Sequence, residues 1–132
     1  MDTPRSVGPL VLVVDDCRDA ADSLALLLKG WGFQTVVAYD GPSALAVALA
    51  RPPAVVLLDL DMPGMDGYEV ARRLRGQPRT AEALLIALTG YGEEEDVSRC
   101  REAGIDLHLL KPCEPEELRR VLDGRLADQP TP

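Results

Sequence analysis

The sequence lacks several features that mark whole classes of protein. No apolar run reaches the roughly 18 residues that a membrane-spanning helix needs, and residues 1–9 contain no apolar signal-peptide core. The chain has three cysteines, and none of them forms a CxxC pair. This cysteine usage argues against a disulfide scaffold and suits a reducing compartment. We therefore expect a cytoplasmic protein that has no association with membranes.

The sequence also has few aromatic residues and no net positive charge. Aromatic residues make up only 4% of the 132 residues, so aliphatic side chains must supply most of the buried surface. The formal net charge is −8, and a surface of that sign repels the phosphates of nucleic acids. An acidic pocket on such a protein attracts divalent cations instead. We expect no direct binding to nucleic acid.

Short apolar runs alternate with helix-like segments along the chain, and this alternation is typical of a parallel sheet with crossover helices. The expected fold class is therefore α/β. The length fits one domain, which we place at residues 10–126 between an N-terminal tail, 1–9, and a C-terminal tail, 127–132. We expect strands at 10–14, 35–38, 54–58, 84–88 and 107–110, and helices that end at Gly30, Ala50, Arg75, Gly104 and Leu126.

Four of the apolar runs end on a reactive polar residue. The first run stops at Asp15 and Asp16, and the third stops at Asp59. The fourth stops at Thr89 and the fifth at Lys111. Parallel strands end along one rim, and ligands of open α/β sheets bind outside that rim. These side chains are therefore expected to share one pocket.

Carboxylates at two of these strand ends suggest a cation and a nucleophile. Asp15 and Asp16 are adjacent, which is unfavourable unless a cation neutralises them, and Mg²⁺ prefers oxygen ligands of this kind. Asp59 ends the most apolar strand, where a carboxylate without a partner is unusual, and a carboxylate can attack phosphorus. The simpler alternatives are a solvated acidic turn for the pair and a loop cap for Asp59.

The hydroxyl and the ammonium group complete the set. Thr89 precedes Gly90, which leaves room for a bulky group beside the backbone. Lys111 can pair either with Asp59 or with a phosphoryl oxygen. A role in the pocket has a simpler alternative in each case: Thr89 would be an ordinary strand residue, and Lys111 an ordinary surface residue. All five pocket residues together predict phosphoryl chemistry more strongly than any one of them does.

Four motifs fit one family. They are Val13-Val14-Asp15-Asp16, the segment from Leu57 to Gly67 (Leu-Leu-Asp-Leu-Asp-Met-Pro-Gly-Met-Asp-Gly), Ala87-Leu88-Thr89-Gly90, and Lys111-Pro112. With these motifs the chain resembles a response-regulator receiver domain of two-component signalling, in the CheY-like superfamily, from about Leu10 to Leu126. The resemblance implies a flavodoxin-like receiver fold, a doubly wound (βα)5 arrangement whose parallel five-stranded sheet has the order 2-1-3-4-5.

The resemblance also implies a metal site and a phosphoacceptor. Asp59 would accept the phosphoryl group. Asp16, Asp59 and the backbone carbonyl of Asp61 would coordinate Mg²⁺, with Mn²⁺ as a possible substitute. Asp15 would assist through water. The implied donor is a phosphohistidine on a histidine kinase or on a histidine phosphotransfer protein.

A phosphorylation-controlled switch is implied as well. Lys111 and Thr89 would contact the phosphoryl group, and Thr89 would move towards it. The change would reach the surface formed by the fourth helix, fifth strand and fifth helix. His108 stands where receivers often carry a switching aromatic residue, so it either rotates inward or remains a half-exposed histidine. Asp61 and Tyr91 are expected to tune the lifetime of the phosphoryl group.

Other readings of the same residues remain open. Asp59-Leu60-Asp61 has the aspartate spacing of haloacid-dehalogenase-like phosphatases, and a degenerate receiver would serve only as an interaction module. A flavodoxin-like cofactor protein is disfavoured because no glycine-rich or hydroxyl-rich phosphate loop follows the first strand. Cys17 and Cys113 each closely follow a pocket motif, so a redox-sensitive pair is an alternative to inert thiols.

Overall fold

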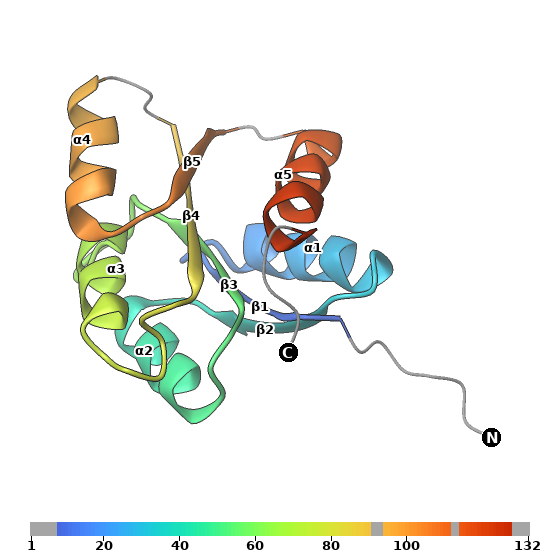
Figure 1. The fold of residues 1–132 in the computed structure, drawn as a ribbon, viewed down its shortest axis with the longest axis horizontal. Helices are drawn as coiled ribbons and strands as arrows, with labels where there is room; N and C mark the ends of the chain where they lie inside the picture. Colours follow the sequence, from blue (N-terminus) through green and yellow to red (C-terminus); the bar gives the residue numbers. More distant parts are fainter. Residues whose placement is uncertain (1–7, 91–93, 112–113, 128–132) are drawn as a thin grey trace.

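The computed structural model describes residues 8–90, 94–111 and 114–127, and it shows one five-stranded sheet between two layers of helices (Figure 1). All strands are parallel, in the order β2-β1-β3-β4-β5, which confirms the predicted α/β fold class and strand order. The central strand is β3, as its uninterrupted apolar sequence indicates. The strands are β1 (Leu10–Val14), β2 (Gln34–Ala38), β3 (Val55–Asp59), β4 (Leu84–Thr89) and β5 (Leu107–Leu110).

The helices cover both faces of the sheet. Helices α1 and α5 lie on one face, and α2, α3 and α4 lie on the other (Figure 1). Among the described residues, none of the helices is long and apolar enough to cross a bilayer. The helices are α1 (Arg18–Gly30), α2 (Gly41–Ala50), α3 (Gly67–Arg75), α4 (Glu94–Ala103) and α5 (Pro115–Ala127).

Successive residues of each central strand point to opposite faces, so the sheet divides the core in two. Leu12 and Leu58 pack under α2, α3 and α4, whereas Val13 and Leu57 pack under α1 and α5. All four side chains are at most 1% exposed. Both clusters are almost wholly aliphatic, as the low aromatic content requires. The core therefore holds the strand ends rigidly beneath the rim.

Two helices begin with aspartate caps beside that rim. The Asp40 carboxylate accepts a hydrogen bond from the Ser43 backbone N–H at 2.7 Å, at the start of α2. The Asp66 carboxylate does the same for the Glu69 N–H at 3.0 Å, at the start of α3. Such caps satisfy backbone donors that have no partner within the helix. They fix where the β2–α2 and β3–α3 loops end.

Several predicted boundaries shift slightly. Strand β2 begins one residue earlier than expected, at Gln34, and α5 continues one residue further, to Ala127. Gly30 is the last residue of α1, but the glycine with positive φ is Gly32, at 98°. The turn needs two more residues before the chain reverses towards β2, so the left-handed position falls on Gly32. The predicted tails fall largely at 1–7 and 128–132, outside the described residues.

Candidate functional site

The predicted pocket residues come together at the carboxyl ends of four strands. Asp15 and Asp16 directly follow β1. Asp59 and Thr89 are the last residues of β3 and β4, and Lys111 directly follows β5. The in-register pairing of the parallel strands keeps these ends level. The rim that the sequence predicts is therefore present, and each of the five residues lies on it.

Asp59 is the most deeply placed charged group of the rim. The residue is only 2% exposed. Its Oδ1 accepts a hydrogen bond from the Asp61 backbone N–H at 3.0 Å and another from the Lys111 ammonium, also at 3.0 Å. The sequence left open whether Lys111 pairs with Asp59 or with a phosphoryl oxygen. In this structure it pairs with the carboxylate.

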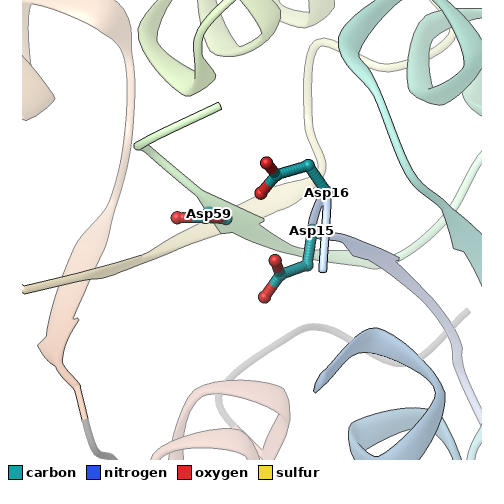
Figure 2. A group of neighbouring side chains, drawn as sticks. All are labelled: Asp15, Asp16 and Asp59. Atoms are coloured by element: carbon teal, nitrogen blue, oxygen red, sulfur yellow. The ribbon is translucent and has the colours of Figure 1, made fainter. Parts of the chain in front are cut away.

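Three carboxylates converge at this point. One oxygen from each of Asp15, Asp16 and Asp59 lies within 4.8 Å of the other two. Figure 2 shows the three side chains pointing into the same space from the ends of β1 and β3. Asp15 and Asp59 are buried and Asp16 is exposed, so the cluster opens to solvent on one side.

The charge of Asp15 is not fully compensated by the protein. Burial raises the pKa of its carboxyl, and the nearby charge of Asp59 raises it further. The backbone N–H of Cys17, which donates to Asp15 Oδ1 at 3.0 Å, and the charge of Lys111 lower this pKa, but they do not outweigh burial and Asp59 together. Hard divalent cations prefer such oxygen ligands, so the cluster fits Mg²⁺.

Lys111 is held in its charged form. Burial of the ammonium acts to lower its pKa. The hydrogen bond and charge of Asp59, together with the charges of Asp15 and Asp61, outweigh burial, so the pKa of Lys111 is raised. Its positive charge therefore remains at the rim throughout the neutral range.

Thr89 precedes a glycine that has open space around it. Thr89 itself is 1% exposed, at the end of β4. A Cβ placed on the following residue, Gly90, would meet no atom within 4 Å. The room that the sequence predicts at Gly90 is therefore present beside the backbone.

The family comparison agrees with this geometry. The sequence pattern described as "Response regulator receiver domain" matches residues 11–123. The chain belongs to this receiver domain family. Members of the family are phosphorylation-controlled signalling domains that bind Mg²⁺.

Individual relatives support the assignment. The receiver domain is 40% identical over 126 residues to the DNA-binding response regulator MtrA of Mycobacterium bovis, an alignment that covers 96% of this chain and 53% of MtrA. The chain thus spans about half the length of that relative. The solved chemotaxis protein CheY4 of Vibrio cholerae has a TM-score of 0.86 and 29% identity, covering 89% of this chain and 98% of CheY4.

A second solved structure bears on the metal. The receiver domain of the sensor histidine kinase PA1611 from Pseudomonas aeruginosa PAO1 has a TM-score of 0.84 and 28% identity to this receiver domain. The match covers 92% of this chain and all of that one, and PA1611 has a magnesium ion coordinated in its active site cleft. This chain has an acidic cluster of Asp15, Asp16 and Asp59 whose carboxylate oxygens could hold a metal ion.

The expected switch residues are only partly described. His108 lies on β5, paired with Ala87 of β4, and is half-buried. Leu110, two residues on and therefore on the same face of the strand, is 52% exposed. Tyr91 and Cys113 lie outside the described residues. The free thiol of Cys17 is exposed, and its pairing with Cys113 stays a hypothesis.

Sequence reasoning missed an apolar groove beside the pocket. Leu24 and Leu27 have the spacing of core residues, yet both are only half-buried because they line this groove between α1 and α5. The helical period identifies the inward side of α1, but it does not show that α5 leaves part of that side uncovered. The groove has a volume of about 450 Å³ and is lined by Asp15, Ala20, Leu24, Leu27, Leu88, Lys111, Pro115 and Leu118.

Proposed function

We propose that Asp59 of this receiver domain accepts a phosphoryl group from a phosphohistidine of a histidine kinase or a histidine phosphotransfer protein. One observation carries the proposal. Asp59 is a buried carboxylate that is held by Lys111 at 3.0 Å and lies in a cluster with Asp15 and Asp16. The domain would catalyse only its own phosphorylation and dephosphorylation. It would not act as an enzyme on other substrates.

The donor set of the cluster determines the proposed metal site. Asp16, Asp59 and the backbone carbonyl of Asp61 would hold Mg²⁺, with Asp15 acting through water. Mn²⁺ accepts the same oxygen ligands. A bound ion would supply positive charge that neutralises the carboxylates and the incoming phosphoryl oxygens.

The transfer itself requires little from the protein beyond positioning and charge. An oxygen of the Asp59 carboxylate forms a bond to phosphorus while the P–N bond to the donor imidazole breaks. The electron pair of that bond returns to the ring, which leaves as neutral imidazole when its other nitrogen carries a proton. Asp59 attacks as the carboxylate, so no general base is required. Lys111 offers its charge to the phosphoryl oxygens from its place beside Asp59.

The phosphoryl group would be sensed at the neighbouring strand end. It adds roughly −1.5 to −2 charges and strong acceptor oxygens, which can bias an element that has two positions. Thr89 would donate its hydroxyl to the group and move towards it. Because Thr89 pairs with Leu110, that movement passes from β4 to β5 and so to the α4-β5-α5 surface. His108 on β5 would take part in this relay.

Two residues are proposed to tune how long the phosphoryl group survives. Asp61 is exposed at the rim, and its carboxylate can repel or orient an attacking water. Tyr91 would screen the group from water. Replacing either residue by alanine should therefore change the rate of dephosphorylation.

The apolar groove is the proposed contact for the donor protein. Asp15 and Lys111 belong both to the groove and to the pocket, so the groove continues directly from the phosphorylation site. A donor protein whose phosphohistidine reaches Asp59 would lie next to this groove. Apolar side chains around the donor histidine would then be buried against Leu24 and Leu27.

The proposal includes a cytoplasmic location and an output through protein contacts. Among the described residues, neither Cys17 nor Cys100 forms a disulfide, which fits a reducing compartment. The net charge of −8 disfavours direct contact with nucleic acid or with anionic membranes. The target protein would bind the α4-β5-α5 surface.

The experiment that tests this function is incubation with acetyl phosphate and Mg²⁺ followed by intact mass. Accumulation of one phosphate per chain supports the receiver function. Continuous release of phosphate from added phosphomonoesters, without a labelled protein, would instead support a phosphatase. Failure to take up phosphate under any divalent cation would support an interaction module.

A further inference from the structure

Gly41, the first residue of α2, lies in close contact with the β3–α3 loop. Gly41 is buried. A Cβ placed on it would lie 2.8 Å from both Cβ and Sδ of Met65 and 2.9 Å from its Cγ. The Met65 side chain therefore lies flat over the Gly41 backbone, and only glycine leaves it that room. Neither residue carries a role in the phosphoryl chemistry described above.

Met65 belongs to the loop segment 62–66, which directly follows Asp61. The ends of this segment are held by hydrogen bonds. The Asp61 N–H donates to Asp59 Oδ1 at 3.0 Å, and the Gly67 N–H donates to the Leu60 carbonyl at 3.3 Å. Between those ends, the segment contains neither helix nor strand.

The middle of the segment has packing contacts on one side only. Pro63 and Gly64 are exposed, and Gly64 has a φ of 76°. Met62 is buried in the core beneath the loop, and Met65 packs against the same cluster. The contact between Met65 and Gly41 joins this loop to the start of α2. It restricts the position of Met65 within the loop.

A side chain at Gly41 would move the loop rather than the helix. The position of a Cβ is set by the backbone, so rotation of the Met65 side chain cannot relieve a Cβ to Cβ distance of 2.8 Å. Helix α2 is anchored by Ala44 and Ala48, both fully buried, and by its Asp40 cap. At the centre of the loop, Pro63 and Gly64 are exposed, so this part is expected to be displaced more readily than the helix.

We propose that Gly41 and Met65 are positioning residues, whose contact sets the place of the Asp61 backbone carbonyl and so the affinity of the pocket for Mg²⁺. This inference rests on the proposed function, because the carbonyl is a proposed ligand there. Substitution of residues that orient the ligands of a metal without touching it commonly changes the metal affinity by roughly 10-fold to 100-fold. Met65 lies four residues after Asp61, so a shift of Met65 would be transmitted along the chain to the Asp61 carbonyl.

The inference is tested by measuring the binding of Mn²⁺ to the full chain. The electron paramagnetic resonance signal of the free ion is the readout. In Gly41→Ala the Kd for Mn²⁺ is expected to rise roughly tenfold. Gly124→Ala is the matched control, since a Cβ at Gly124 in α5 meets no atom within 4 Å. Its Kd is expected to equal that of the parent. Melting temperatures of both variants, measured alongside, separate metal affinity from stability.

A double-mutant cycle tests the contact itself. Met65→Gly adds no atom, so it remains informative even if Gly41→Ala does not fold, and it should also weaken Mn²⁺ binding. In the Met65→Gly background, Gly41→Ala is expected to change the Kd by less than about twofold, because the strained contact is gone. The same tenfold loss in both backgrounds would show that another contact is responsible.

The outcomes distinguish this inference from the function on which it rests. A parent chain that binds Mn²⁺, with Gly41→Ala binding equally well, overturns the positioning role and leaves the proposed function intact. A lower melting temperature with an unchanged Kd also overturns it, because the contact would then be purely structural. A parent chain that binds no Mn²⁺ overturns the proposed metal site and the inference together.

Discussion

The ammonium of Lys111 donates a hydrogen bond to Oδ1 of Asp59 over 3.0 Å, so the end of β5 is joined directly to the end of β3. The two side chains differ in accessibility, with 39% of Lys111 exposed against 4% of Asp59. Lys111 thus reaches the buried carboxylate from the solvent side. In the proposed function, Lys111 would transfer its contact from Asp59 to the phosphoryl group from this solvent-exposed position.

Removal of the Lys111 charge should slow phosphorylation. Lys111→Met keeps much of the aliphatic stem but takes away a donor to the charge that develops on the phosphoryl group. We expect the rate of phosphorylation by acetyl phosphate to fall on the order of a hundredfold. Lys29→Met is the matched control, because Lys29 is exposed at the end of α1. Equal rates in the two variants would contradict the role of Lys111.

Neutralising Asp15 should stabilise the apo domain in a pH-dependent way. Burial raises the pKa of Asp15 above its ordinary value of 3.8. At a pH between 3.8 and the raised pKa, the native state therefore holds more protons than the unfolded chain. Stability from this group therefore falls as pH rises through that window. Asp15→Asn keeps an acceptor for the Cys17 N–H and removes the charge.

Urea denaturation checks this prediction. Without divalent cations, Asp15→Asn is expected to be more stable than the parent at pH 7, and the gain is expected to shrink as the pH approaches 3.8. A gain of equal size at every pH would show that packing, and not charge, is responsible.

Mg²⁺ should stabilise the domain against heat. A ligand that binds only the native state adds about 2.7 kcal/mol at one hundred times its Kd. We expect the melting temperature to rise with Mg²⁺ and to return to its starting value after chelation. Asp16→Asn should abolish most of the rise, whereas Asp19→Asn, at an exposed position of α1, should keep it. A rise of the same size in both variants would place the ion elsewhere.

The groove between α1 and α5 should matter for a protein donor and not for a small one. Leu27→Glu places a charge in the apolar groove. We expect phosphotransfer from a phosphorylated histidine phosphotransfer protein to slow about tenfold, which corresponds to a contact worth roughly 1.4 kcal/mol. The rate with acetyl phosphate should be unchanged. Leu26→Glu is the control, since Leu26 is 69% exposed and does not line the groove.

Much of the site follows from sequence because strand ends are a local property. Apolar runs that stop at Asp15, Asp59 and Lys111 show where three strands end, and parallel pairing then brings those residues to one rim. The same argument predicts the fold class. The strand order came from family resemblance, because alternation of strands and helices alone is compatible with more than one order.

Other features depend on packing between distant segments, which sequence periodicity does not describe. The partner of Lys111 was left open because it depends on a contact across the sheet. The half-buried state of Leu27 follows from the placement of α5. The need for glycine at position 41 depends on the Met65 side chain, which sequence periodicity does not place beside it. In each case the deciding neighbour lies far away along the chain.

The most direct test of the central claim is the intact mass of the parent, Asp59→Asn and Asp123→Asn proteins after incubation with acetyl phosphate and Mg²⁺. Asp123 is an exposed carboxylate of α5 and serves as the control. We predict one phosphate on the parent and on Asp123→Asn, and none on Asp59→Asn. Equal uptake by Asp59→Asn, or no uptake by the parent, would contradict the assignment of Asp59 as the phosphoacceptor.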